Sequence, residues 1–399
     1  MTEDPFAKTR ALFELPAGVI YLDGNSLGPM MTRARARVLR EIDESWGREL
    51  IRAWNSAGWI DLPARVGDKI AKLIGAPAGS VIAADSTSIN LYKALIAALR
   101  LAPTRKLILS DNGNFPTDLY IAEGVVATLD AGYRLKVVGP EDVEAAIDGE
   151  VAVLMLTQVD YRTGRLHDMA RLTEKARALG IVTVWDLAHS AGAFPVDLTA
   201  CGVDFAVGCG YKYLNGGPGA PAFIYARPDL QSRAAAALSG WMGHAAPFDF
   251  DLSYRPAPNI DRLRSGTPSV LSMACLDAAL DAFDSVEMAQ VRARSIELSE
   301  AFRARVEALC PQLTLASPRD PAARGSQISF RFANGYAAMQ ALIARGVIGD
   351  FRAPDIMRFG FTPLYVSLSD VLAAAEIIAE VMNRRAWDKP EFLSRNKVT

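Results

Sequence analysis

Residues 185–219 read WDLAHSAGAFPVDLTACGVDFAVGCGYKYLNGGPG and place two charged residues just after predicted buried strands. The apolar run 181–185 predicts one strand, which ends immediately before Asp186, and the run 204–209 predicts the next, which ends shortly before Lys212. In open α/β sheets, ligands bind beyond the carboxyl ends of the strands. A carboxylate and an amine at two such ends therefore favour a ligand site over a purely structural role.

The surroundings of Lys212 are typical of a reactive amine. Lys212 stands between Tyr211 and Tyr213, and the glycine-rich loop 216–219 follows it. A lysine in such a site can form a Schiff base with a carbonyl compound. Pyridoxal 5'-phosphate (PLP) requires such a lysine, together with a carboxylate for its pyridinium nitrogen, and Asp186 is placed for the second role. The alternative is an ordinary surface lysine and a helix-capping aspartate.

Strands and helices alternate on both sides of this stretch. Residues 151–157 (VAVLMLT) form a short apolar run suited to a strand that is buried on both faces. Residues 169–179 have helical periodicity, and Gly180 is placed to end that helix. Repeated strand–helix–strand units predict an α/β fold with a mainly parallel central sheet flanked by helices. Further strands are predicted at 81–84, 107–110, 135–138 and 222–226, and further helices at 89–101 and 118–128.

Both ends of the chain differ from this central pattern. The sequence ISFRF at 328–332 alternates like an antiparallel strand with one solvated face. Charged or closing helices are predicted at 33–52, 286–309 and 371–385. We therefore expect a large domain over residues 60–280 and a smaller α/β domain built from both termini, residues 1–59 and 281–399.

Composition and charge exclude several classes of protein. The 399 residues are 50% hydrophobic and 22% charged, with a net charge of −2, so the basic excess typical of nucleic-acid binding is missing. No apolar run approaches the ~20 residues of a membrane span, and the first ten residues do not resemble a signal peptide. The four cysteines form no C-x-x-C pair, and no cluster has metal-ligand spacing. We expect a cytoplasmic protein without a metal, membrane or nucleic-acid partner.

Several segments resemble those of the kynureninase family, within the class V aminotransferase group of fold-type I PLP enzymes. YLDGNSLGPM at 21–30 and YKYLNGGPG at 211–219 are specific when they occur together. The resemblance runs from about residue 20 to 385 and implies the fold-type I architecture with PLP as cofactor. The other matching segments are NFPTDLY (114–120), DLAHSAG (186–192), GWMGH (240–244) and RFGFTPLY (358–365).

The resemblance implies a role for each matching residue around the cofactor ring. Lys212 corresponds to the lysine that holds PLP, Asp186 to the partner of the pyridinium nitrogen, and His189 to a residue that supports the ring site. Phe115 corresponds to the aromatic residue stacked on the ring, and Asp118 lies close to the imine. Further cofactor contacts are expected from Pro116, Thr117 and Thr157, the last of these near the ring hydroxyl.

The phosphate group is expected at the start of a helix. Thr87 and Ser88 match the phosphate-binding turn, where free N–H groups and the helix dipole favour an anion. Tyr211 is also expected to reach the phosphate. With Lys212, Tyr211 is the second expected catalytic residue, because its hydroxyl can carry a proton.

Two further positions imply a second subunit, and one implies a substrate contact. Trp241 and Thr267 match phosphate contacts that the family supplies from a neighbouring subunit, so a homodimer with a shared active site is expected. Arg358 resembles the arginine that binds the α-carboxylate of the substrate, a role suited to a planar guanidinium. Arg345 and Arg352 are the alternatives for this role.

The resemblance implies hydrolysis of L-kynurenine to anthranilate and L-alanine, in tryptophan catabolism through the kynurenine pathway. The product feeds either anthranilate degradation or NAD biosynthesis. Gly266 and Thr267 lie where the family varies, and they favour kynurenine over 3-hydroxykynurenine. The alternatives are a cysteine desulfurase, for which Cys310 is the only late cysteine, an aminotransferase, and a non-catalytic α/β binding protein.

Overall fold

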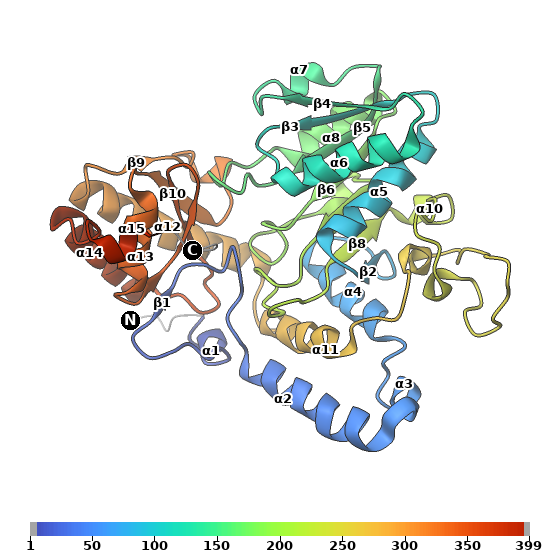
Figure 1. Ribbon diagram of the computed structural model, residues 1–399, viewed down its shortest axis with the longest axis horizontal. Helices are drawn as coiled ribbons and strands as arrows, with labels where there is room; N and C mark the ends of the chain where they lie inside the picture. The colour runs from blue at the N-terminus through green and yellow to red at the C-terminus, as the bar shows by residue number, and fades with distance from the viewer. Residues whose placement is uncertain (1–5, 395–399) are drawn as a thin grey trace.

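A seven-stranded sheet forms the larger part of the molecule in the computed structural model, which describes residues 6–394 (Figure 1). The strand order is β2-β8-β7-β6-β5-β3-β4, and only β8 runs antiparallel to its neighbours. The predicted mainly parallel sheet is therefore confirmed. Its strands are β2 Val81–Ala83, β3 Leu107–Asp111, β4 Arg134–Val138, β5 Val151–Thr157, β6 Val182–Asp186, β7 Phe205–Gly208 and β8 Phe223–Ala226.

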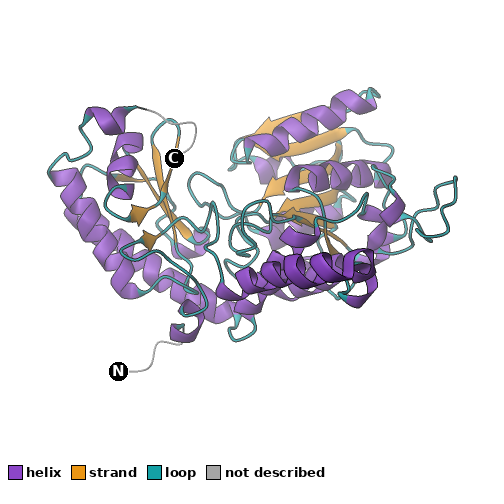
Figure 2. Ribbon diagram, turned by 60° about the horizontal axis from the view of Figure 1, so that its bottom comes forward, coloured by secondary structure: helices purple, strands orange, loops and turns teal. Residues whose placement is uncertain are grey.

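Two hydrophobic cores, one on each face of this sheet, explain why its strands are apolar throughout. Along β5, Val153 and Met155 pack into one core, whereas Leu154 and Leu156 pack into the other. This alternation follows the two-residue period of a strand. Figure 2 shows helices on both faces of the sheet. One face is covered by α5 (Thr87–Leu101) and α6 (Pro116–Leu129), and the other by α4 (Leu62–Leu73), α8 (Met169–Ala178) and α11 (Val270–Ala279).

A smaller antiparallel sheet, of order β12-β13-β10-β9, lies beside the large one (Figure 1). Strand β1 (Ile20–Tyr21) pairs with β11 (Val347–Ile348), which joins the N-terminal segment to this C-terminal part. The domain limits at residues 60 and 280 remain a prediction. The other elements here are α12 Met288–Leu309, β9 Thr314–Leu315, β10 Gln327–Arg331, α13 Gly335–Ile343, β12 Asp350–Arg352, β13 Ile356–Gly360 and α14 Leu368–Asn383.

Two local predictions differ from the structure. The helix predicted at 33–52 is α-helical only over α2 (Thr32–Arg40) and continues as a π-helix, Glu41–Glu49. Gly47 suits this wider coil, since a Cβ there would lie 2.8 Å from the carbonyl oxygen of Ile42. Strand β10 is antiparallel as expected, but it has no solvated face over its first four residues. Ser329, a residue of the expected solvated face, is buried, and its N–H donates to the Ser317 Oγ at 2.8 Å.

The remaining elements are short. None of the helices in residues 6–394 has the length and apolar character needed to cross a membrane. The short elements are α1 Ala7–Arg10, η2 Leu50–Arg52, α3 Ala53–Ser56, α7 Val143–Ala146, α9 Leu198–Cys201, α10 Pro228–Gln231, η3 Trp241–Gly243, η4 Ile260–Leu263, η5 Leu280–Phe283, η6 Pro321–Ala323 and α15 Pro390–Leu393.

Candidate active site

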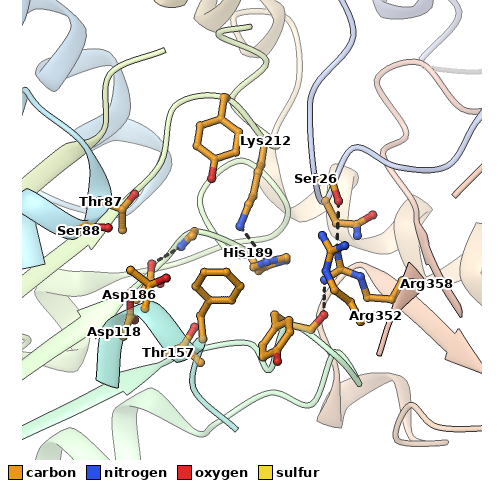
Figure 3. Close-up of a pocket in the computed structure, with 16 residues that line it drawn as sticks. Ser26, Thr87, Ser88, Asp118, Thr157, Asp186, His189, Lys212, Arg352 and Arg358 are labelled. Carbon is orange, nitrogen blue, oxygen red and sulfur yellow. Dashed lines mark hydrogen bonds between the residues drawn. The ribbon is translucent and has the colours of Figure 1, made fainter. Parts of the chain in front are cut away.

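A cavity of about 200 Å³ lies between the edge of the large sheet and the smaller sheet. Figure 3 shows Lys212 pointing toward His189, with Asp118 and Asp186 on one side and Arg352 and Arg358 on the other. Most of the predicted site residues line this cavity. They are Thr87, Ser88, Phe115, Thr117, Asp118, Thr157, Asp186, His189, Tyr211, Lys212 and Arg358.

The parallel strands bring the polar residues together because their carboxyl ends meet at one edge of the sheet. Thr157 and Asp186 end β5 and β6 and are paired in register. The Asp186 carboxylate accepts a 2.7 Å hydrogen bond from the N–H of Ala188, which fixes the turn that leads to His189. Both Asp186 and His189 are buried. Asp186 and His189 therefore lie at the carboxyl end of a buried strand, as the pattern at 185–189 indicates, and their roles stay a prediction.

Lys212 and His189 are in direct contact. The Lys212 Nζ lies 3.0 Å from the His189 Nε2. Burial, together with the nearby Lys212, lowers the pKa of His189 well below its usual value, so the imidazole is neutral at pH 7. Its Nε2 then accepts the Lys212 N–H, and Nδ1 carries the proton. Within residues 6–394, no hydrogen-bond partner meets this buried Nδ1.

Two buried carboxyl groups, Asp118 and Asp186, face each other. Burial is the main cause that raises the pKa of Asp118 well above its usual value, and repulsion from Asp186 adds to it. The pKa of Asp186 is raised by burial, although Lys212 and the Ala188 N–H oppose the shift. The Asp118 Oδ2 is buried and meets no hydrogen-bond partner in the described part of the chain. The pair is thus suited to a cationic group that is not itself a side chain of this pocket.

The amino end of α5 opens onto the cavity. Thr87 and Ser88 are the first two residues of this 15-residue helix, and the Ser86 side chain caps it by accepting from the N–H of Ile89. The N-terminal N–H groups and the helix dipole favour a bound anion at this end. Thr87 and Ser88 thus lie at a helix start, and their role in binding a phosphate stays a prediction.

Phe115 lies over the cavity rather than in a core. Its side chain is 44% exposed, and its ring contacts Tyr161 edge-on, with 5.1 Å between the ring centroids. Pro116 starts α6 and does not line the cavity. Tyr211 is partly buried, and burial raises the pKa of its hydroxyl above the usual value, so the phenol is protonated at neutral pH.

Arg358 is buried on β13 and held by a dense set of acceptors. Its Nε donates to Asp350 at 2.6 Å, its Nη2 donates to Asp350 and Ser26, and its Nη1 donates to the carbonyl oxygen of Tyr161. Arg352 also pairs with Asp350, at 2.8 Å, and lines the cavity. The two strands that carry these residues are adjacent, with Asp350 opposite Arg358 in register.

Four polar or aromatic residues that line the cavity had no predicted role as site residues. Asn25 and Ser26 lie within the matching segment 21–30, which was their one sequence signal, and Arg352 was an alternative to Arg358. Tyr161 follows β5 in a loop with no distinctive pattern. The four are Asn25, Ser26, Tyr161 and Arg352.

Trp241 and Thr267 lie outside the cavity. Trp241 is 39% exposed and stacks edge-on against Phe248. Thr267 lines a separate, smaller cavity with Asp85 and Ser265. The structure therefore does not bring these two predicted site residues to the pocket of the same chain.

The described residues contain no candidate site for cysteine-based or metal-based catalysis. All four cysteines are free, and none lines the main cavity. Cys310, the late cysteine, is fully buried, which raises the pKa of its thiol to about 11. No group of metal-ligating side chains was found within residues 6–394.

Comparison with solved structures identifies the fold. A cysteine desulfurase from Thermococcus onnurineus NA1 superposes with a TM-score of 0.80 at 18% identity, covering 94% of this chain and 98% of that one. A C-DES variant with glycine linked covalently to the PLP cofactor superposes with a TM-score of 0.81 at 17% identity, covering 93% and 99%. At these identities the likeness concerns the fold alone, which is that of the fold-type I PLP enzymes.

Comparison with curated sequences identifies the family. The chain is 49% identical to the kynureninase of Pseudomonas fluorescens and 50% identical to that of Burkholderia pseudomallei (strain 1106a). Each match covers 100% of this chain and 97% of the relative. The family model of the kynureninase C-terminal domain matches residues 291–378. The chain therefore belongs to the kynureninase family.

Proposed function

We propose that the protein hydrolyses L-kynurenine to anthranilate and L-alanine with PLP as its cofactor. One observation carries this proposal. The Lys212 amine and the Asp186 carboxylate share a buried pocket in a chain that is about 50% identical, over its whole length, to curated kynureninases. A lysine and a carboxylate are the two protein groups that PLP chemistry requires.

The pocket fits PLP on three counts. The facing carboxyl groups of Asp118 and Asp186 suit a pyridinium cation, which would offset the repulsion between them. The amino end of α5 suits the phosphate, and the exposed ring of Phe115 suits stacking on an aromatic ring. Lys212 would hold the aldehyde carbon of PLP, and Thr157 lies in register with Asp186 for the ring hydroxyl.

Lys212 and Tyr211 are the residues proposed to move protons. When bound, PLP supplies a carbonyl group for amines and a ring that takes up electrons from the α-carbon of the substrate. The Lys212 amine removes the α-proton, and the neutral His189 beside it can accept its N–H without competing for positive charge. The protonated Tyr211 hydroxyl can donate to the γ-carbonyl oxygen as water adds there.

The overall reaction requires one water molecule. The bond between the β- and γ-carbons breaks, the γ-carbon takes the hydroxyl group as the carboxyl of anthranilate, and the β-carbon takes a proton as the methyl of L-alanine. A Tyr211→Phe variant tests the proton role. We expect α-proton exchange to persist and the formation of anthranilate to slow by at least ~10²-fold. Unchanged cleavage would remove Tyr211 from the mechanism.

Trp241 and Thr267 are proposed to serve the active site of a second copy in a homodimer. Their position outside the pocket of their own chain, with Trp241 exposed, supports this assignment. Subunit mixing tests it. Lys212→Ala and Trp241→Ala chains should regain activity when mixed, because one site of the hybrid would be intact. No recovery in a mixture that forms hybrids would contradict a shared site.

A cytoplasmic location and a preference for kynurenine complete the proposal. Four free cysteines support a reducing compartment. Thr267 offers the basis for the substrate preference, since discrimination depends on a hydrogen-bond partner for the extra hydroxyl group. Steady-state rates with kynurenine and 3-hydroxykynurenine would measure it, and a clear preference for the hydroxylated substrate would overturn it.

Release of fluorescent anthranilate from L-kynurenine is the direct test of the proposed function. We expect release in stoichiometric amounts with L-alanine, dependent on PLP. Transfer of the amino group to a keto acid without anthranilate would instead indicate an aminotransferase. A desulfurase is disfavoured by the full burial of Cys310, outside the cavity.

A further inference from the structure

The side chain of Asn25 is a buried amide that lines the active-site cavity without a partner. It is 0% exposed, and neither Nδ2 nor Oδ1 forms a hydrogen bond within residues 6–394. A buried amide of this kind is unfavourable unless a ligand or water satisfies it. Its place in the wall of the cavity indicates a ligand.

Asn25 lies beside Arg358. Gly360 follows Arg358 by two residues on β13, so the two residues present the same face of the strand. A Cβ at Gly360 would clash with the Asn25 Oδ1, so the asparagine occupies the space that a side chain at 360 would take. The next residue, Ser26, accepts a hydrogen bond from Arg358 at 3.1 Å. Asn25 and Arg358 are therefore neighbours in the wall of the cavity.

Arg358 alone has little capacity left for a substrate carboxylate. A guanidinium has five N–H groups. Of these, Nε and one Nη2 hydrogen bind Asp350, the second Nη2 hydrogen binds Ser26, and one Nη1 hydrogen binds the Tyr161 carbonyl, which leaves a single Nη1 hydrogen. Asp350 also neutralises the charge of Arg358. A second donor and a second positive charge are needed for tight carboxylate binding.

The charged groups around Arg358 can balance one further negative charge. Arg352 adds a second positive charge against Asp350, and its side chain remains 35% exposed. Asp23 is the other acidic group near this cluster. Burial and repulsion from Asp350 raise its pKa to about 7, so it carries only part of a negative charge at neutral pH. A substrate carboxylate would therefore meet a net positive environment.

We propose that Asn25 is a specificity-determining residue, whose side-chain amide donates a hydrogen bond to the α-carboxylate of the substrate beside the remaining N–H of Arg358. Arg352 supplies the balancing charge. This inference rests on the proposed function, since it takes the amino-acid end of kynurenine as the ligand. The aromatic amine and γ-carbonyl of kynurenine are not involved in this contact.

Two small ligands each carry one end of the substrate, so their binding tests the two ends separately. L-Alanine, the amino-acid product, has the carboxylate but no γ-carbonyl. Kynuramine, the amine that remains when kynurenine loses its carboxylate, has the γ-carbonyl but no carboxylate. The binding of each is measured by titrating the PLP-loaded protein and following the absorbance of the cofactor. The variants are Asn25→Ala and Asn25→Asp, with Asn383→Ala, a surface asparagine at the end of α14, as the control.

We expect Asn25→Ala to weaken L-alanine binding by about tenfold or more, the range for a hydrogen bond to a charged group. Kynuramine binding should stay within about twofold of the wild type. Asn25→Asp, which keeps the shape but adds repulsion, should weaken L-alanine further and still spare kynuramine. Asn383→Ala should change neither.

Equal losses for both ligands, or a loss for kynuramine alone, would overturn the proposal, because a structural role or a γ-carbonyl contact predicts those patterns. Thermal unfolding of each variant shows whether it is folded, and Asn25→Ala removes no hydrogen bond between described residues. Failure of the wild type to release anthranilate would overturn the proposed function. It would leave the L-alanine titration as an independent measure of the Asn25 contact.

Discussion

The two sides of the active-site pocket are built on opposite principles. On the side of the large sheet, Asp118 and His189 keep buried polar atoms without a partner in the described chain, and two carboxyl groups face each other. On the side of the smaller sheet, Arg358 is surrounded by acceptors and Asp350 neutralises it, although the buried Asn25 amide lacks a partner in the described chain. The first side needs a cationic group to offset its paired carboxyl groups, whereas the second already pairs its cation and offers a substrate the Asn25 amide and one N–H of Arg358.

This difference indicates how each ligand is held. A cationic cofactor on the first side relieves the repulsion between the carboxyl groups and can contact the buried polar atoms that lack a partner. Such a cofactor should therefore bind tightly. A substrate on the second side gains only the remaining donors, which suits an exchangeable ligand. The comparison predicts that changes on the first side act on chemistry, and that changes on the second act on stability and substrate affinity.

The largest effect is expected for Lys212→Ala. Removing the amine should lower kcat by at least ~10³-fold, because both cofactor attachment and proton transfer are lost. Stability should be almost unaffected, since the one hydrogen bond that Lys212 Nζ makes to described residues is with His189. Anthranilate release and thermal unfolding measure the two quantities, with exposed Lys389→Ala as the control. A variant that keeps most of its activity would show that the chemistry does not depend on Lys212 on the cofactor side of the pocket.

Replacing the two arginines should separate stability from affinity. Arg358→Gln leaves the buried Asp350 with Arg352 as its remaining cation and with the Ser26 hydroxyl, so we expect a loss of about 3–5 kcal/mol in the free energy of unfolding, together with a higher KM. Arg352→Gln removes a half-exposed partner and should cost about 1 kcal/mol or less, with KM still raised several-fold. Urea unfolding and steady-state kinetics measure both. Equal destabilisation by the two changes would show that Asp350 does not depend mainly on Arg358.

The smallest effect concerns pH. In the cofactor-free protein, the raised pKa of Asp118 means that the folded state holds this proton more tightly than the unfolded state. The resulting stability is present below the ordinary carboxyl pKa of ~4 and is lost as the pH rises through the folded value. Asp118→Asn is neutral at every pH, so its stability relative to the wild type should increase with pH.

Thermal unfolding of the cofactor-free proteins between pH 5 and pH 8 checks this prediction. Asp229→Asn is a suitable control, because Arg227 lowers the pKa of that exposed carboxyl group, so it is ionised in the folded and unfolded states throughout this range and its stability difference from the wild type should stay constant. A constant difference between Asp118→Asn and the wild type would mean that the folded state does not hold the Asp118 proton more tightly than the unfolded state.

The sequence predicted the cofactor side of the pocket much better than the substrate side. Asp186 and Lys212 follow strands of a parallel sheet, and the carboxyl ends of such strands meet at one edge, so local pattern was enough to place them. The helix after β2 was predicted from residue 89, two residues later than its observed start at Thr87, and the place of Thr87 and Ser88 at that start came from the family resemblance.

The substrate side depends on contacts between distant segments. Ser26 bonds to Asp350 across 324 positions of the chain, and Arg358 reaches Tyr161 across 197. The hydrophobic period of a sequence does not reveal contacts between distant segments. The sequence therefore predicted neither the ion pair of Asp350 with Arg358 nor the unpaired side-chain amide of Asn25. The solvated face predicted for residues 328–332 was wrong at Ser329, which is buried and whose N–H donates to the Ser317 Oγ of an earlier segment.

Reduction of the PLP-loaded protein with borohydride, followed by peptide mass spectrometry, tests the central claim most directly. Borohydride fixes the Schiff base between PLP and its lysine as a stable adduct. We expect one phosphopyridoxyl group, located on Lys212, and none on the buried Lys93 in the middle of α5. Adduct on Lys93 or on a surface lysine, with Lys212 unmodified, would contradict the assignment of this pocket.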